Sequence, residues 1–173
     1  MTVLSDMITV SRLKELLNYS PETGKFTRIK FDVPGNRHLV GNIAGSFCSN
    51  GYHNICVDGR TYKAHRLAWL YMTGKWPNHQ IDHANGNRGD NRFSNLREAT
   101  NSQNQQNRGI QTSNTSGHKG VHYFPRKRPW RASIRRAGKQ IHLGCFATKE
   151  EAAKAYADAA KIYHGKFAKA YDL

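Results

Sequence analysis

The sequence predicts an α+β protein built from small antiparallel sheets and short helices, in two parts joined by a polar segment. Three observations support this class. A strong hairpin signal, Asp58-Gly59, separates the strand-like runs 52–57 and 60–63. Apolar residues recur at helical spacing in the segments 65–72 and 148–165. The length of 173 residues allows one ordinary domain or two small ones.

The first part of the chain is expected to combine two helices with several strands. Ser11 is the expected N-cap of a short helix that carries leucines on one face. The turn 20–24 is expected to open a strand over 25–30. The apolar run 65–72 is expected to form a core helix, because Gly74 follows it and stops it.

The last part of the chain is expected to form a small three-stranded antiparallel sheet with one packed helix. The expected strands are 120–123, 130–136 and 140–146. Thr148, with a glutamate three residues later, has the pattern of a capping box, and Gly165 stands where such a helix would end.

Composition points to a polyanionic partner. The chain has 27 Lys+Arg and 12 Asp+Glu, a formal net charge of +15, and a pI near 10.0. Eight of the basic residues and no acidic residue lie between Lys119 and Lys139, interleaved with Tyr123, Phe124 and Trp130. Nucleic acid is the commonest polyanion that fits this pattern, although a solvated basic surface is the alternative.

Other compositional features exclude several classes of protein. No apolar stretch is long enough for a membrane span, and the N-terminus lacks the pattern of a secretory signal. The three cysteines, Cys48, Cys56 and Cys145, form no C-x-x-C pair, which argues against a disulfide scaffold and against a cysteine zinc site. A reducing cytoplasm is therefore the expected compartment.

The central segment 81–97 concentrates groups that bind hard cations and move protons. Asp82 and His83 are adjacent, so on a strand they face opposite sides, and one is able to address a metal while the other addresses a nucleophile. Carboxylate and amide oxygens suit Mg²⁺, and an imidazole suits proton abstraction near neutral pH. On composition alone, an Asn- and Asp-rich surface loop remains the favoured alternative.

The order of residues in this segment adds a resemblance. Asp82-His83, Asn85-Gly86-Asn87, Asp90-Asn91-Arg92, Ser94-Asn95-Leu96-Arg97 and the Asn/Gln run 101–107 resemble the HNH homing endonucleases of phages and introns, from about His65 to Arg108. The resemblance implies a ββα-metal finger over about 78–108, within a nuclease domain spanning 1–110. It also implies one divalent ion, Mg²⁺ or Mn²⁺, and hydrolysis of a DNA phosphodiester.

The resemblance assigns a role to individual residues of this finger. His83 would be the general base, and Asp82 a metal ligand. Asn95 would brace the loop and orient the histidine. Asn104 would be the second metal ligand, with Asn101 or Asn107 taking this role if the register differs by a turn. Further expectations concern neighbouring side chains: a structural or phosphate-contact role for His79, and packing or capping for His65. Any of the four arginines around the site is a candidate for phosphate contact: Arg88, Arg92, Arg97 and Arg108.

Residues 117–173 resemble the plant ethylene-response-factor (APETALA-type) DNA-binding domain. The similarity rests on Arg128-Pro129-Trp130, Leu143-Gly144-Cys145-Phe146 and the stretch 148–165. It implies a sheet that enters the major groove with the helix behind it. The implied DNA contacts are Arg126, Arg128, Trp130, Arg131, Arg135 and Lys139. Because Ser133 replaces the usual Glu, plant base specificity is not transferred, and readout of bases or of phosphates alone stays open.

Together these features predict a site-preferring, homing-type DNA endonuclease. Its parts would be a nuclease domain, 1–110, a linker, 111–117, and a DNA-binding domain, 118–173. The expected partner is double-stranded DNA, with no membrane, in the cytoplasm of a host bacterial cell if a phage encodes the protein. A non-catalytic DNA-binding regulator and an RNA-binding protein are the alternatives, and the oligomeric state is open.

Overall fold

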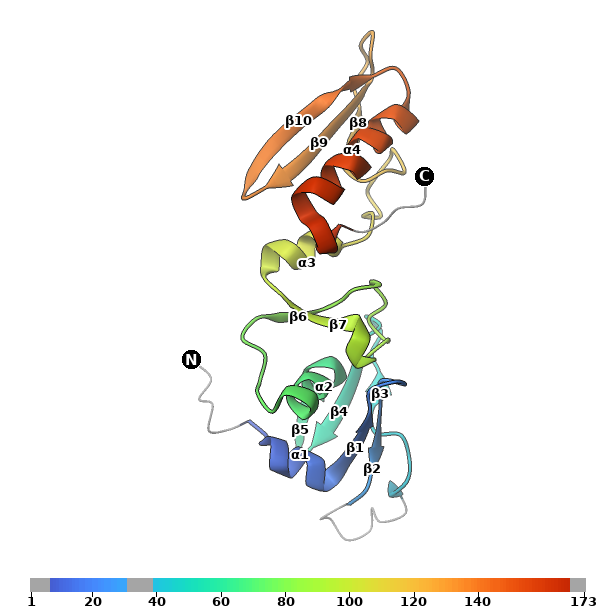
Figure 1. Cartoon of the computed structure of the whole chain (residues 1–173). Helices are drawn as coiled ribbons and strands as arrows, with labels where there is room; N and C mark the ends of the chain where they lie inside the picture. Colours follow the sequence, from blue (N-terminus) through green and yellow to red (C-terminus); the bar gives the residue numbers. More distant parts are fainter. Residues whose placement is uncertain (1–6, 31–38, 169–173) are drawn as a thin grey trace. The chain divides into compact units, whose positions relative to one another are not determined.

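The computed structural model describes residues 7–30 and 39–168, which form two compact units, Met1–Ala99 and Thr100–Leu173 (Figure 1). Both units combine short helices with small antiparallel sheets, so the predicted α+β class is confirmed. The division falls ahead of the nuclease boundary that we expected at residue 110. Within the described ranges, no helix has the length and apolar character needed to cross a bilayer.

The first unit contains two helices, one 3₁₀ turn and seven strands among its described residues. Their bounds are α1 (Val10–Leu16), β1 (Leu17–Ser20), β2 (Lys25–Arg28), β3 (Ser46–Phe47), β4 (His53–Val57), β5 (Arg60–Lys63), α2 (Ala64–Thr73), β6 (Gln80–His83), η3 (Phe93–Asn95) and β7 (Leu96–Ala99). The strands form a β1–β2 hairpin, a sheet of order β3–β4–β5 and a β6–β7 hairpin.

Local sequence signals account for most of these boundaries. Asp58 and Gly59 have positive φ, 48° and 73°, as the predicted tight turn between β4 and β5 requires. Helix α2 ends at Gly74, whose φ of 74° closes the helix. The expected cap of α1 was wrong: the hydroxyl of Thr9, not Ser11, accepts the hydrogen bond from Arg12 N, at 3.2 Å. Both leucines of the helix, Leu13 and Leu16, are buried.

The core of this unit joins its helices to the β6–β7 hairpin. Leu13, Phe26, Ile55 and Leu67 are almost completely buried, and Ile81 of β6 belongs to the same cluster. Burial of such side chains is the main favourable term in folding. The hairpin that carries the central Asp-His pair is therefore anchored to a packed core, although its flanking loops are polar.

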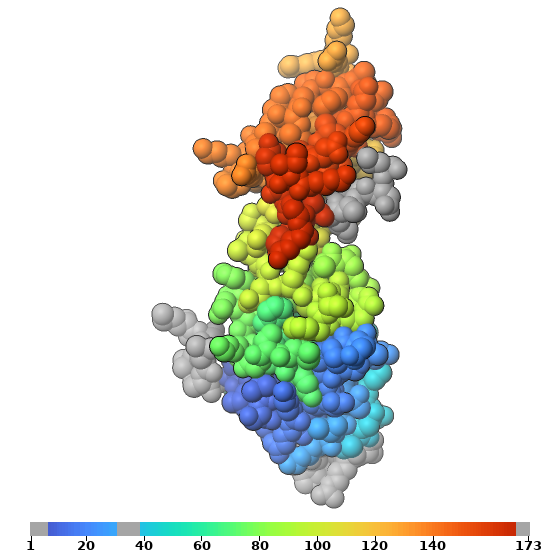
Figure 2. Space-filling view, in the orientation of Figure 1, coloured from blue at the N-terminus to red at the C-terminus, as the bar shows by residue number. Residues whose placement is uncertain are grey.

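The second unit consists of α3 (Asn101–Asn107), β8 (Val121–Tyr123), β9 (Trp130–Arg136), β10 (Lys139–Phe146), α4 (Lys149–His164) and η4 (Gly165–Phe167). The sheet order is β10–β9–β8, and α4 lies against one face of the sheet (Figure 1). This is the predicted three-stranded sheet with one packed helix. Figure 2 shows the β8–β9 loop, 124–129, standing out from the surface of this unit.

The close packing of α4 depends on small residues. Ala152 and Ala153 of the helix pack with Ala132 and Val121 of the sheet. A Cβ on Gly120 would lie 2.3 Å from the Tyr156 ring, so this position has no room for a side chain. Thr148 and Glu151 form the predicted capping box, and α4 ends at Gly165.

The segment expected to be a linker, 111–117, contains a defined turn. The Ser116 hydroxyl is buried and donates to the carbonyl of Val121, at 2.8 Å. The Asn114 side chain accepts from Gly117 N and donates to the carbonyl of His118, at 2.7 and 3.0 Å. These bonds tie the segment to the start of β8, and the division of the chain into nuclease, linker and DNA-binding domain stays a prediction.

Candidate active site

Asp82 and His83 occupy successive positions of β6 and are both buried, with 5% and 4% of their surface exposed. In the β6–β7 ladder, Asp82 pairs with Arg97 and His83 pairs with Leu96. One oxygen of Asp82 accepts a hydrogen bond from Arg97 Nε at 2.8 Å, and Arg97 Nη2 lies 2.7 Å from it. The carboxylate and the imidazole therefore have different neighbours, as strand alternation requires.

The imidazole of His83 lies in a cluster of polar and aromatic side chains. Its Nε2 is 3.1 Å from Oδ1 of Asn91. Its ring centroid lies 5.0 Å from that of His65, edge to face, and 6.1 Å from that of Tyr52. An amide oxygen only accepts hydrogen bonds, so Nε2 carries the proton and, in the neutral ring, Nδ1 keeps a lone pair.

The surroundings of His83 favour its neutral form. Burial lowers the pKa of His83 below its usual value, and the charge of Arg88 lowers it further. The Asn91 hydrogen bond, Asp82 and Asp90 raise the pKa of His83, but burial outweighs them. A neutral imidazole with a lone pair on Nδ1 is competent to accept a proton near pH 7.

Asn91 is itself fixed by the N-terminal hairpin. It is 2% exposed, and its backbone carbonyl accepts a 2.6 Å hydrogen bond from the hydroxyl of Tyr19 on β1. Burial raises the pKa of Tyr19, which keeps this hydroxyl protonated as a donor. Gly24 has a φ of 71°, and a Cβ there would lie 2.4 Å from Arg92 N. The β1–β2 turn therefore contacts the backbone beside Asn91 directly.

Asn95 holds together the loop that follows His83. Its Oδ1 accepts from Asn85 N at 3.0 Å, and its Nδ2 donates to Asn85 Oδ1 and to the carbonyl of Asp90, at 3.1 and 2.8 Å. Asn95 thus links the two ends of the loop 85–90, and its catalytic role stays a prediction. The hydrogen bond that orients His83 comes from Asn91, a residue to which the sequence analysis gave no role although it lies within the resembling motif.

Two of the four arginines expected to contact phosphate, Arg92 and Arg97, have carboxylate partners. Arg92 Nε and Nη2 lie 2.8 and 2.6 Å from the Asp90 oxygens, and this pairing lowers the pKa of Asp90 to about 2. Arg97 is paired with Asp82. Both arginines are thus engaged in ion pairs within the site, and a phosphate contact of either arginine stays a prediction.

The two histidines near the motif differ in environment. His65 on α2 is buried, and within the described residues its Nδ1 has no hydrogen-bond partner. Burial and the nearby charges, including His83 and Lys63, lower the pKa of His65 to about 3. It is thus a neutral packing group beside His83. His79 is exposed and lies before β6 begins.

The second metal-ligand candidate, Asn104, lies on α3 in the second unit. The helix begins with a capping box formed by Thr100 and Gln103. Asn101 is exposed, Asn104 is half-buried and Asn107 is buried. The assignment of Asn104 as a ligand stays a prediction.

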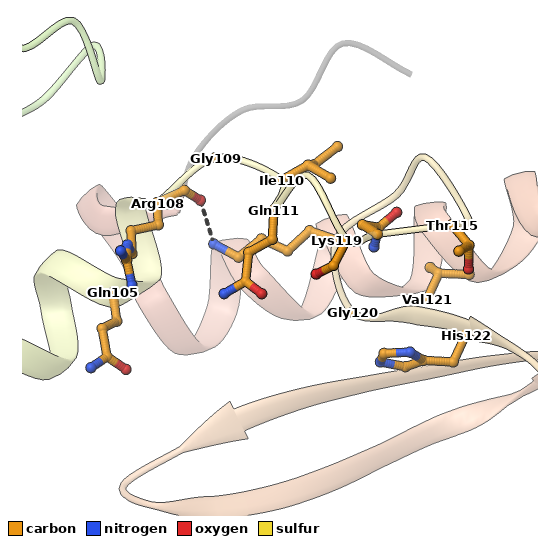
Figure 3. A pocket seen from close by; sticks show the side chains of 12 residues that line it. Gln105, Arg108, Gly109, Ile110, Gln111, Thr115, Lys119, Gly120, Val121 and His122 are labelled. Carbon is orange, nitrogen blue, oxygen red and sulfur yellow. Dashed lines mark hydrogen bonds between the residues drawn. The ribbon is translucent and has the colours of Figure 1, made fainter. Parts of the chain in front are cut away.

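A pocket of about 340 Å³ lies in the second unit, between the end of α3, the segment 109–120 and β8 (Figure 3). Lys119 Nζ donates to the carbonyls of Gln106 and Arg108, at 2.7 and 2.8 Å. A cation at these carbonyls is favourable because the end of a helix carries partial negative charge. Lys119 therefore stabilises the C-terminal end of α3.

The sheet of the second unit separates the predicted DNA-contact residues by face. Arg131 pairs with Cys145 and Arg135 pairs with Gln140, and both arginines lie on the face away from α4. Trp130 lies on the opposite face and packs against the core beneath α4. The remaining candidates are exposed outside the centre of the sheet: Arg126 and Arg128 in the β8–β9 loop, and Lys139 at the start of β10.

Comparisons with known proteins agree with the central motif. Residues 62–106 match the family model of the HNH endonucleases. Protein 3.8 of Escherichia phage T7 is 33% identical over 112 residues, which are 62% of this chain and 92% of that protein. The chain belongs to the family of this phage protein and carries an HNH endonuclease domain.

A solved structure is also similar. It is a structure of the HNH homing endonuclease I-HmuI, described for DNA binding and cleavage. The similar regions of the two chains are 24% identical in sequence, with a TM-score of 0.44. They cover 58% of this chain and 55% of that chain, so this protein spans about half the length of that chain.

The donor atoms of the HNH domain suit a hard cation. Asp82 offers carboxylate oxygens, and the neighbouring asparagines offer amide oxygens. Within the described residues, no three His, Cys, Asp or Glu side chains gather into a metal-binding cluster. Mg²⁺ needs no such cluster, because proteins often hold it by one or two carboxylates together with substrate phosphates.

The first prediction concerns the Asn91–His83 hydrogen bond. In Asn91→Leu the imidazole loses its acceptor, so we expect a mixture of neutral tautomers and a lower pKa for His83. Asn91→Asp keeps an oxygen and adds a negative charge, so the pKa of His83 should rise. Nitrogen-15 NMR of the histidines measures both quantities. Unchanged tautomer and pKa in Asn91→Leu would show that the bond does not orient His83.

The second prediction concerns the pH dependence of stability. The pKa of His65 is about 3 when folded, against 6.5 as the ordinary value, so between these pH values the unfolded chain binds more protons. The free energy of unfolding should therefore fall on acidification, by up to about 1.4 kcal/mol per pH unit from this group.

Urea unfolding of His65→Leu and of the wild type between pH 7 and pH 4.5 measures this contribution. The variant should lose less stability than the wild type over this range. Equal losses would contradict the assignment of a buried, neutral His65.

Proposed function

We propose that this protein is a metal-dependent DNA endonuclease of the homing type, in which His83 is the general base. The observation that carries this proposal is the buried His83–Asn91 pair, which leaves a lone pair on Nδ1 of a neutral imidazole. Membership in the family of the phage T7 protein and the HNH endonuclease domain support the reaction class.

In the proposed reaction, Nδ1 of His83 takes a proton from a water molecule as its oxygen attacks the phosphorus. The bond from phosphorus to the 3′ oxygen breaks, and that oxygen leaves with the electron pair. The hydrogen bond from Nε2 to Asn91 Oδ1 stabilises the imidazolium that forms, and Asn95 keeps the loop in place.

We propose Asp82 and Asn104 as the ligands of one divalent ion, Mg²⁺ or Mn²⁺. When bound, such an ion supplies positive charge to the phosphate and to the leaving oxygen. Of the two proposed ligands, only Asp82 carries a formal charge. Asp82 is adjacent to His83 on β6, but the two side chains have different neighbours. Arg97, the partner of Asp82 on β7, orients the buried carboxylate and balances its charge.

Residues 118–173 are the proposed DNA-binding domain. The segment from residue 117 to the end carries 13 basic and 4 acidic residues, a net charge of 13 − 4 = +9. Arg131 and Arg135 share the face of the sheet that α4 does not cover. We propose this face, with the exposed Arg126, Arg128 and Lys139, as the surface that contacts double-stranded DNA. The relationship to a phage protein supports action in the cytoplasm of a bacterial host.

The third prediction tests the general base. His83→Ala should lower the rate of DNA cleavage by about 100- to 10,000-fold while DNA affinity stays close to that of the wild type, since a base mainly stabilises the transition state. The measurement is conversion of supercoiled plasmid with Mg²⁺ or Mn²⁺, beside binding without metal.

His79→Ala is the matched control, because this histidine is exposed and lies just outside β6. A phosphate contact of His79 would change the KM for DNA, but kcat of this variant should stay close to the wild-type value, unlike that of His83→Ala. Cleavage by His83→Ala at the wild-type rate would reject the assignment, and absence of metal-dependent cleavage by the wild type would favour the non-catalytic regulator.

The fourth prediction tests the uncovered face of the sheet. Arg135 and Arg136 are adjacent, exposed and equally charged, but Arg136 lies over the Tyr163 ring on the α4 side. Arg135→Ala should weaken duplex binding and reduce the log–log salt slope by about 0.9, whereas Arg136→Ala should change neither. Fluorescence anisotropy at several salt concentrations measures both, and single-stranded RNA as competitor tests the RNA-binding alternative. Equal effects of the two substitutions would remove the sheet face from the DNA-binding surface.

A further inference from the structure

A tight turn beside the His83 site holds a carbonyl and an aromatic ring in fixed positions. In the turn between β3 and β4, Cys48 N donates to the carbonyl of Tyr52 and Gly51 N donates to the carbonyl of Cys48, at 2.8 and 2.9 Å. Gly51 has a φ of 82°, which only glycine adopts readily. The turn thereby presents the carbonyl of Asn50 and the ring of Tyr52.

Arg88, from the loop after β6, is held by this turn. Its Nη1 donates to the carbonyl of Asn50 at 3.0 Å. A Cβ on Gly51 would lie 3.9 Å from Arg88 Cβ, so the arginine stem runs close to the turn. The Arg88 guanidinium carbon lies 5.0 Å from the centroid of the Tyr52 ring. Its position is therefore set by both a hydrogen bond and a ring contact.

A second cation lies over the ring of Tyr52. Lys63, the last residue of β5, has its ammonium nitrogen 3.9 Å from the Tyr52 centroid. The same ring lies 5.3 Å from His65 and 6.1 Å from His83. Two exposed cations and the proposed general base therefore surround one tyrosine, although they come from separate segments of the chain.

These two cations differ in their partners from the arginines that lie beside carboxylates in the site. Among the residues that the structure describes, neither Lys63 nor Arg88 is paired with a carboxylate, in contrast to Arg92 and Arg97. Contact with an aromatic ring stabilises a cation only modestly and leaves its charge intact. Arg88 acts on the site already, since its charge lowers the pKa of His83. Two neighbouring positive charges favour an anion, and a phosphate accepts hydrogen bonds from both side chains.

We propose that Lys63 and Arg88, positioned on Tyr52, form a phosphate clamp that binds the backbone of the DNA strand cleaved at His83. The proposal rests on the proposed nuclease function. Holding the backbone phosphate beside the scissile one would orient the strand toward Nδ1 of His83, and it would carry no sequence information. The hydrogen bond to Asn50 and the ring of Tyr52 preorganise Arg88, so less conformational freedom is lost when DNA binds.

The experiment compares Lys63→Ala, Arg88→Ala and the double variant with Lys75→Ala, all in the full chain. Lys75 is an exposed lysine of the same unit that follows Gly74, beyond the end of α2. His65 lies in the first turn of this helix, about 12 Å along the axis from its last residue, Thr73. Each clamp substitution should raise the KM for DNA about tenfold and reduce the salt slope of binding by about 0.9, with kcat nearly unchanged. Lys75→Ala should match the wild type. Arg88→Lys keeps the charge and should recover part of the affinity.

A chemical substitution identifies which phosphate is bound. A duplex with one neutral methylphosphonate next to the mapped cut should weaken wild-type binding and cleavage, but should add little to the loss in the double variant. Equal losses from the methylphosphonate in both proteins would place the bound phosphate elsewhere and overturn the proposal.

The clamp and the nuclease fail in different ways. If the wild type cuts DNA and the clamp variants keep the KM and salt slope of Lys75→Ala, the clamp is rejected and the nuclease stands. If the wild type does not cut DNA with any divalent metal, the nuclease is rejected. The salt slopes of binding then still decide whether Lys63 and Arg88 bind phosphate.

Discussion

The hydrogen bond between His83 and Asn91 is the interaction on which the site depends. A buried neutral imidazole keeps a single tautomer when a fixed acceptor binds the proton on one ring nitrogen, which leaves the lone pair on the other nitrogen. Asn91 is fixed because Tyr19 binds its carbonyl and the turn at Gly24 contacts the next residue without space for a Cβ. The N-terminal hairpin is thus part of the site, although the residues that bear the proposed chemistry lie elsewhere in the sequence.

A second constraint applies to strand β6, which buries a carboxylate next to a neutral imidazole. A charge without a partner would be costly in this environment, and a carboxylate facing the imidazole would favour its protonated form. Strand alternation turns Asp82 away from His83, and the cross-strand position of Arg97 neutralises it. Burial therefore remains the dominant effect on His83.

Features encoded by neighbouring residues were predictable from the sequence, and features that depend on distant contacts were not. The Asp58-Gly59 turn and the capping box at Thr148 follow from short motifs, and the structure contains both. Asn91 and Tyr19 are 72 residues apart, so no local pattern indicates their bond. The helix cap at Thr9 instead of Ser11, and the turn within the expected linker, likewise depend on burial and on hydrogen bonds that only the fold reveals.

The fold narrows the set of basic residues that are candidates for DNA contact, because it shows which of them already have other partners. The sequence shows 27 basic residues, but the fold assigns them different tasks. Arg92 and Arg97 neutralise carboxylates in the site, and Lys119 stabilises the end of α3. The charge of an arginine paired with a carboxylate is largely balanced by that partner, whereas a cation supported by a neutral ring or carbonyl keeps its full charge for the ligand. For this reason Lys63 and Arg88, the cations on Tyr52, are better placed to bind a phosphate than Arg92 and Arg97, which are paired with carboxylates.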